Sequence, residues 1–208
     1  MISVAATGFF TGFSLILAIG AQNTFVLRQG LLRQHVFALC LLCAFSDAIL
    51  ISLGVAGFGW LVSLSPNLPI LMSLAGAVFL LSYGGLRFRA AIKGDYTPET
   101  ATSETGLWRV LATGAALTWL NPHVYLDTLG LIGAISTQYT VLADKFVFAS
   151  AAMLASFVFF FGLGYGARLL SPIMQTARAW RIFDTLVGLV MWALAVNLVL
   201  NALRHVAA

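Results

Sequence analysis

The chain has 208 residues, of which 61% are hydrophobic and 9% charged, with a formal net charge of +4 and a mean hydropathy of +0.97. Soluble domains carry roughly 25% charged residues, so this composition excludes an ordinary water-soluble domain and predicts a protein of the lipid bilayer. The basic residues are spread along the chain rather than clustered, which argues against nucleic acid as a partner.

Six segments have about the length of a transmembrane helix, which requires roughly 20 apolar residues. They are residues 3–26, 36–61, 69–86, 109–132, 146–168 and 182–202. The runs are long and unbroken rather than alternating in short pieces, so helices are expected and strands are not. The first segment lacks a preceding basic residue and is longer than the core of a signal peptide, so we expect it to be retained as a span. The predicted fold class is an all-α integral membrane protein with about six transmembrane helices.

A hydrophilic stretch at 87–109 is rich in Thr, Ser, Glu and turn-forming residues, and we interpret it as a cytoplasmic linker within a single transmembrane transporter domain, 1–208. It separates a first three-helix half, 1–86, from a second, 110–208. Three spans per half require any repeat to be inverted in the membrane. The matched motifs are Gly20-Ala21-Gln22-Asn23 with Asn121-Pro122-His123-Val124, and Ser46 and Gly54 with Ser156 and Gly164.

The basic residues lie mostly in loops on one side of the predicted membrane. The loops after odd-numbered spans hold nine of the eleven: Arg28, Arg33, Arg87, Arg89, Lys93, Arg109, Arg168, Arg178 and Arg181. Only Lys145 and Arg204 fall on the other side. Because cytoplasmic loops carry the excess of Lys and Arg, we predict a multi-pass protein of the bacterial inner membrane with both termini in the periplasm. Arg28, directly after the first span, is interpreted as an interfacial anchor.

The fourth segment contains Asn121-Pro122, which predicts an interrupted helix. Pro122 has no N–H, so the carbonyl of Thr118 loses its helical partner, and Asn121 is driven towards an extended conformation. Asn121 is a good N-cap, and proline is favoured at the first position of the next helix. We therefore predict a second half-helix with free N–H groups that suit an anionic group. The alternative is a simple proline kink.

The first segment has a similar interruption at Gly20, followed by the amides of Gln22 and Asn23. Unpaired polar groups are costly in an apolar span, although a packed glycine with amides bonded to a neighbour is the alternative. Two breaks at matching positions of the two halves predict a binding site between them, with both helices 1 and 4 broken.

Two acids inside predicted spans, Asp47 and Asp127, are costly unless they have a partner or a function. His123 lies four residues before Asp127 and should share its helical face. The alternative is that each Asp is neutral and hydrogen-bonded, or paired with a loop arginine. Trp119 and Tyr125 flank the break and either line a cavity or pack in the core.

The remaining local patterns predict structure rather than chemistry. Cys40 and Cys43 are interpreted as core residues, and no metal site or cofactor is predicted. Gly8 with Gly12 has the spacing that allows close helix packing. The pair Gly162 and Gly166 has the same spacing.

Several motifs together resemble the LysE superfamily of exporters, and the His123-Val124 variant is similar to its arginine-exporting branch. They are Ile19-Gly20-Ala21-Gln22-Asn23, Arg28-Gln29-Gly30, Ser46-Asp47 and Thr118-Trp119-Leu120-Asn121-Pro122-His123-Val124-Tyr125-Leu126-Asp127. The resemblance covers essentially the whole chain, with Ala21 where the family usually has proline. It implies export of basic amino acids, namely arginine with lysine or canavanine, driven by the membrane potential or by proton exchange in antiport.

The expected site follows from these residues: a substrate carboxylate at the helix break and cationic groups at Asp47 and Asp127. The expected substrate-binding residues are Gly20, Gln22, Asn23, Asp47, Trp119, Asn121, Pro122, His123, Tyr125 and Asp127. The alternatives are an exporter of another amino acid, a membrane subunit of a larger complex, or an intramembrane enzyme using Asp47 and Asp127. The sequence has no Gly-x-Gly-Asp, His-Glu-x-x-His, Gly-x-Ser-x-Gly or Walker motif, so we predict a transporter and not an enzyme. The coupling ion and a homo-oligomeric state are left open.

Overall fold

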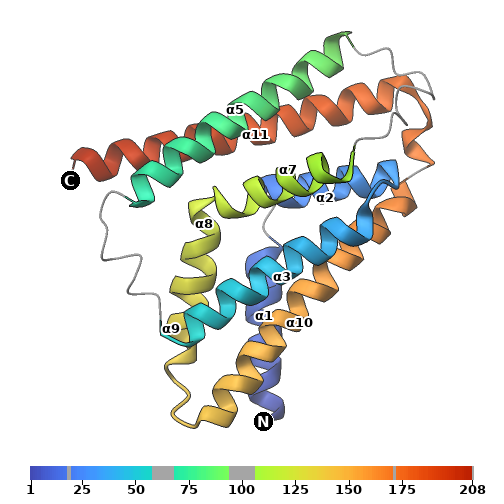
Figure 1. The fold of residues 1–208 in the computed structure, drawn as a ribbon. Coiled ribbons are helices and arrows are strands. Elements are labelled where there is room, and N and C mark those ends of the chain that lie inside the picture. Colours follow the sequence, from blue (N-terminus) through green and yellow to red (C-terminus); the bar gives the residue numbers. More distant parts are fainter. Residues whose placement is uncertain (18–19, 58–67, 94–105, 171, 208) are drawn as a thin grey trace.

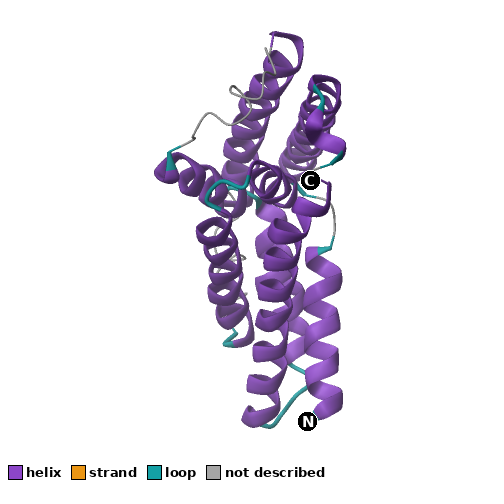
Figure 2. Cartoon of the chain, turned by 90° about the vertical axis from the view of Figure 1, so that its right-hand side faces the viewer, coloured by secondary structure: helices purple, strands orange, loops and turns teal. Residues whose placement is uncertain are grey.

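The computed structural model describes residues 1–17, 20–57, 68–93, 106–170 and 172–207. Within these ranges the chain forms helices and connecting loops, with no strand (Figure 2). The elements are α1 (Ile2–Ile16), α2 (Ala21–Leu32), α3 (Val36–Val55), α5 (Leu68–Lys93), α7 (Leu107–Trp119), α8 (Pro122–Tyr125), a π-helical turn η1 (Leu126–Ile132), α9 (Gly133–Ser136), α10 (Leu142–Gly166), the 3₁₀ turns η2 (Ala167–Leu170) and η3 (Ile173–Gln175), and α11 (Ala177–Ala207). The predicted all-α class is confirmed.

Three described helical segments are long and apolar enough to cross a membrane: Val36–Val55, Leu142–Leu170 and Ala177–Leu200. The bent pair α1 and α2 meets the same criterion when its two helices are taken as one span. Large apolar side chains cover the outer faces of these helices, where water would disfavour them and lipid would not. Examples are Phe37, Phe45, Leu154, Leu189 and Leu200. A membrane protein is thus supported, while the number of six spans stays a prediction.

The two broken helices turn at the positions that the sequence predicts. The axes of α1 and α2 differ by 83°. In the second half, α7 ends at Trp119 and α8 begins at Pro122, from which the chain turns away through η1 and α9 (Figure 1). Part of the predicted linker at 87–109 is helical, because α5 continues to Lys93 and α7 begins at Leu107. Residues 94–105 of that linker lie outside the described ranges.

Small residues allow α1 to pack closely on α10. A Cβ atom at Gly8 would collide with the backbone of Phe148, and one at Gly12 would crowd Ala152. The close approach predicted for this glycine pair is therefore confirmed. The same prediction is wrong for Gly162 and Gly166 of α10. A Cβ atom at either glycine would meet no described atom within 4 Å.

The core between α3 and α10 contains both cysteines, which are free and buried. The thiol of Cys40 donates to the carbonyl of Phe160 at 3.1 Å, so α3 and α10 are joined at this point. The prediction that Cys40 and Cys43 serve as core residues is confirmed.

Helices α5 and α11 form a layer of their own, running side by side for most of their lengths (Figure 1). Gly84 packs against Trp192 and Gly188 against the ring of Phe88, so each helix offers a groove to an aromatic residue of the other. The indole N–H of Trp192 donates to the carbonyl of Leu81 at 3.2 Å. The described contacts of this two-helix layer with the rest of the chain are mainly with α2, α7, α8 and η3.

Candidate binding site

A cavity of about 270 Å³ lies where the two broken helices meet α3, α5 and α11. Its walls are largely apolar, with Phe79, Leu117, Phe160 and Leu194 among them. A smaller number of polar side chains face into it, which is the usual composition of a small-molecule site. The polar lining residues are Gln22, Asn23, Asp47, Asn121, His123, Asp127 and Thr128.

The break between α1 and α2 supplies one wall of the cavity. Gly20 is extended, with φ −120° and ψ 171°, and α2 begins at the next residue. The Asn23 side-chain amide donates to the carbonyl of Ile16 at 2.7 Å, which satisfies a backbone acceptor exposed by the break. No described side chain caps the start of α2, and the residues at this start line the cavity. The positive end of the helix therefore faces the cavity.

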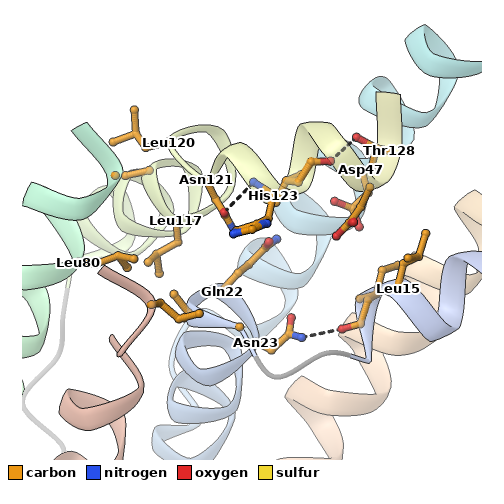
Figure 3. Close-up of a pocket in the computed structure, with 18 of the residues that line it drawn as sticks. Leu15, Gln22, Asn23, Asp47, Leu80, Leu117, Leu120, Asn121, His123 and Thr128 are labelled. Atoms are coloured by element: carbon orange, nitrogen blue, oxygen red, sulfur yellow. Dashed lines mark hydrogen bonds between the residues drawn. The ribbon is translucent and has the colours of Figure 1, made fainter. Parts of the chain in front are cut away.

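Gln22 brings a hydrogen-bond donor into the same wall. The residue is only 7% exposed, and its Nε2 has no hydrogen-bond partner among the described residues. Figure 3 shows the Gln22 amide, the His123 ring and the Asp47 carboxylate directed towards one space. An unpaired buried donor is costly, which makes Nε2 a natural partner for an anionic group of a ligand.

The second break, between α7 and α8, is held by Asn121. Its side-chain oxygen accepts from the N–H of His123 at 3.1 Å, and its carbonyl accepts from the N–H of Val124 at 3.2 Å. The break and the predicted N-cap are confirmed. The prediction of free N–H groups at this point is wrong for His123 and Val124, because Asn121 uses both donors.

The carbonyls that Pro122 leaves without helical partners are also satisfied. The N–H of Asn121 donates to the carbonyl of Thr118 at 3.3 Å. The Tyr125 hydroxyl donates to the carbonyl of Trp119 at 2.9 Å. Hydrogen bonds within the second break thus pair these carbonyl and N–H groups without water, as an interruption inside a bilayer requires.

Asp47 projects from the middle of α3 to the cavity and is only 4% exposed. The hydroxyl of Ser156 on α10 donates to its Oδ2 at 2.9 Å. On the neighbouring position of α3, Ser46 accepts from the indole N–H of Trp119 at 3.2 Å. The carboxylate is thus held between α3 and α10 with its orientation set by one hydrogen bond.

His123 on α8 and Asp127 on η1 reach the cavity from the second broken helix, and both are partly exposed. Asp127 lies in the π-helical turn η1. Such turns are rare in proteins, and many of those that occur lie at functional sites. Among the described lining residues, Asp47, Asp127 and His123 are the titratable ones, and none is Lys or Arg. The site therefore offers two carboxylates for cations and, at Gln22 and the start of α2, donors for an anion.

A family model described as a LysE type translocator matches residues 13–202. The chain belongs to the LysE family. Translocation rather than catalysis is the activity that this family description gives, and no solved structure matches the chain.

The curated relatives in the LysE family extend over the whole chain. An arginine exporter protein ArgO of Salmonella paratyphi A is 42% identical over 208 residues, which covers 99% of this chain and 97% of the relative. The ArgO protein of Salmonella typhimurium has the same identity and coverage. The ArgO protein of Enterobacter sp. (strain 638) is 41% identical, and the alignment covers 99% of this chain and 98% of that relative.

The structure brings most of the expected site residues of this LysE family member together. Those that line the cavity are Gly20, Gln22, Asn23, Asp47, Asn121, His123 and Asp127. Trp119, Pro122 and Tyr125 are not among the lining residues, and they shape the second break instead. The role of each residue towards a substrate stays a prediction.

Asp184 is a functional candidate that the sequence reasoning missed. It is completely buried on α11, with Arg28 and Arg87 as its ion-pair partners. Arg28 thus has a buried ion-pair partner, and its interpretation as an interfacial anchor stays a prediction. The signal was present, because Asp184 is the only acid in the predicted span 182–202.

Proposed function

We propose that the chain is a secondary transporter that exports basic amino acids, chiefly L-arginine, across the inner membrane of a bacterium. The observation that carries this proposal is the cavity between two helix breaks, with two carboxylates and no Lys or Arg among its described lining residues. The relatives named as arginine exporters support the choice of substrate. L-lysine and canavanine are expected as further substrates because each also combines a carboxylate with a basic side chain.

The substrate carboxylate binds at the start of α2 in this proposal. The Gln22 Nε2 donor lacks a described partner, and the positive end of a 12-residue helix points to the same place. The start of α8 is less suitable, because Asn121 has already used the N–H groups of His123 and Val124. Gly20 and Asn23 act by holding the first break open.

The cationic groups of the substrate bind at Asp47 and Asp127. A cation entering an apolar cavity loses its hydration, and a fixed carboxylate offsets part of that cost. The hydroxyl of Ser156 orients Asp47 from α10, and the break held by Asn121 positions His123 and Asp127. Trp119, Pro122 and Tyr125 contribute indirectly by maintaining that break.

The six spans form a three-plus-three inverted repeat in this proposal, with a broken helix beginning each half. Reciprocal glycine contacts support it. Gly30 of α2 packs against Gly164 of α10, while Gly133 of α9 packs against Gly54 of α3. Each broken helix thus meets the second long helix of the other half through a pair of glycines. Transporters built this way place their substrate between the halves.

Both termini are periplasmic in this proposal. The last residues of α2, α5 and α10 and the first residues of α3, α7 and α11 gather at one end of the molecule (Figure 1). The nine basic residues after odd-numbered spans belong to these helix ends and the loops beside them. A single basic end is what the positive-inside rule expects for the cytoplasmic face.

Proton exchange is the coupling that we favour. Moving one positive charge outwards against an inside-negative potential costs about 2.3 kcal/mol per 100 mV. Entry of one proton for each exported cation would move no net charge and would remove this cost. His123 and Asp127 are the groups of the cavity placed to carry such a proton.

Counterflow in proteoliposomes that contain only this protein tests the proposal. We expect L-arginine, L-lysine and canavanine to exchange with labelled L-arginine, and neutral amino acids to do so weakly. Asp47→Asn keeps the shape but removes the charge, so it should lower arginine exchange at least about tenfold, and more than any residual exchange of neutral amino acids. Asp127→Asn is measured in the same way. If Asp127 binds the substrate, the variant should lower the exchange of basic amino acids most, and if it carries the coupled proton, the exchange of all substrates should fall alike.

Asp144→Asn is the matched control, because Asp144 lies in the first turn of α10 and does not line the cavity. It should behave as wild type. Absence of arginine exchange by the wild-type protein would contradict the proposed function, and a preference for neutral amino acids would indicate an exporter of another amino acid. Wild-type exchange in both Asp47→Asn and Asp127→Asn would contradict the assigned site.

A further inference from the structure

A second group of charges lies outside the cavity, at Arg28, Arg87 and Asp184, and is called the ion cluster below. Asp184 on α11 is completely buried. Its Oδ1 lies 3.4 Å from Nε of Arg28 on α2 and 3.7 Å from Nη1 of Arg87 on α5. The Arg28 and Arg87 side chains are only 17% and 19% exposed, so the cluster is a largely buried one.

The ion cluster lies on helices that also form the cavity. Counting along each helix, the cluster residue is six positions from Gln22 on α2, eight from Phe79 on α5 and ten from Leu194 on α11. At 1.5 Å per residue these separations are about 9, 12 and 15 Å. In each case the cluster residue is on the side of the basic helix ends, so the ion cluster lies between the cavity and that end of the molecule.

Aromatic residues separate the two sites. The rings of Phe25 and Tyr83 meet edge to face at 5.9 Å, and Phe79, a cavity residue, stacks on Tyr83 at 6.4 Å. The guanidinium of Arg87 lies over the Tyr83 ring at 5.2 Å. A molecule that passes from the basic end to the cavity along these helices would therefore meet the ion cluster first and the aromatic layer second.

Neither arginine of the ion cluster forms a tight pair with Asp184. Tight arginine–carboxylate pairs have N–O distances of roughly 2.7–2.9 Å and often two parallel hydrogen bonds. The two N–O distances to Asp184 are longer, and Nε of Arg87 has no partner among the described residues. A buried ion pair is also weak evidence for stability, since apolar residues of similar size often stabilise as well.

We propose that Asp184 is a second binding site for a guanidinium or ammonium group, at the basic end of the path to the cavity, and that Arg28 occupies it as a resident competitor. A transported arginine would displace the Arg28 guanidinium from Asp184 and offer its own carboxylate to the released arginine. Because Arg28 joins α2 to the layer of α5 and α11, its displacement also releases one tie between that layer and the rest of the molecule. This inference rests on the proposed export of basic amino acids.

Equilibrium binding of L-[³H]arginine to the purified full-length protein tests this role. Removal of a resident competitor raises apparent affinity, so Arg28→Gln should bind arginine at least about threefold more tightly than wild type. The gain should vanish when Arg28→Gln is combined with Asp184→Asn. A merely structural role for the ion cluster predicts the opposite sign, because loss of Arg28 would then weaken the fold and its binding.

Arg33→Gln is the matched control, since Arg33 is exposed at the end of the same helix and is absent from the ion cluster. It removes the same charge and should leave the affinity unchanged. Unchanged or weaker binding by inserted Arg28→Gln, or a gain that persists without Asp184, would overturn the inference. If Arg28→Gln does not insert, Arg28→Lys decides, because lysine competes less well than arginine for a carboxylate and should give an intermediate gain.

The two proposals fail differently. Wild-type protein without saturable arginine binding would contradict the proposed function, whatever the variants do. Wild-type protein that binds arginine, together with an Arg28→Lys variant that binds it no more tightly, would contradict the role of Asp184 alone.

Discussion

At the scale of single residues, the site consists of a few polar side chains held by apolar walls. Asp47 has one hydrogen bond from Ser156, and Gln22 has a buried donor without a described partner. Such groups are costly inside a bilayer unless a ligand completes them. In the proposed function, the donors at the start of α2 bind the anionic end of the substrate and the carboxylates on α3 and η1 bind its cationic end.

The substitution Gln22→Glu tests the anionic end of this arrangement. It keeps the size of the side chain but replaces the unpaired donor by a negative charge. Repulsion should weaken L-arginine exchange about tenfold, whereas agmatine, which is arginine without its carboxylate, should bind at least as well as it does to wild type. Competition for labelled arginine in proteoliposomes measures both ligands. Equal losses for arginine and agmatine would show that Gln22 does not face the carboxylate.

At the scale of helices, the two breaks are built differently. Asn23 reaches back across the first break to Ile16, while Asn121 and Tyr125 close the second. In both, side chains replace the missing backbone hydrogen bonds, which allows a helix to be interrupted within the bilayer. The first break leaves the start of its helix without a side-chain cap, whereas Asn121 caps the start of α8.

Pro122→Ala tests the second break. The substitution restores an N–H that can donate to Thr118, which favours a helix continuing from α7 into α8 and draws Asn121 and His123 away from the cavity. Transport should fall roughly tenfold, while membrane insertion persists. Arginine counterflow and the amount of inserted protein are measured together. Pro172→Ala, in an exposed turn before η3, should transport like wild type. Full activity of Pro122→Ala would show that transport does not need the break and that Pro122 only causes a packing kink.

At the scale of the whole molecule, α5 and α11 form a layer whose described contacts lie mainly between its own two helices. Its two helices run side by side (Figure 1), and its contacts with the rest of the described chain are mainly with α2, α7, α8 and η3. Both the cavity and the ion cluster lie where this layer meets the rest. Movement of the layer against the other helices would change access to both sites at once, as alternating access requires.

The predicted membrane orientation is testable by reporter fusions. A fusion after residue 95 should report the cytoplasm, and a fusion at the C-terminus should report the periplasm, because the basic helix ends favour the cytoplasmic side. Alkaline phosphatase and green fluorescent protein, which work on opposite sides of the membrane, provide paired measurements at each position. A cytoplasmic C-terminus would be incompatible with six spans and a periplasmic N-terminus.

The sequence by itself determined the features that depend on local chemistry. Composition predicted a membrane protein, and the long unbroken apolar runs predicted helices. The covalent structure of Pro122 predicted both the break and the role of Asn121. Buried acids in apolar runs identified Asp47 and Asp127, because a charge in such a run is conspicuous without any knowledge of its neighbours. Seven of the ten expected site residues line the cavity.

Only the tertiary structure decided which polar groups have partners. The N–H groups expected to be free at α8 are used by Asn121, whereas the uncapped helix start is that of α2. Asp184 is paired with Arg28 across 156 positions of the sequence, and no local pattern relates residues so far apart. Hydrogen bonds and ion pairs depend on distances of about 3 Å between side chains, and helix packing sets those distances.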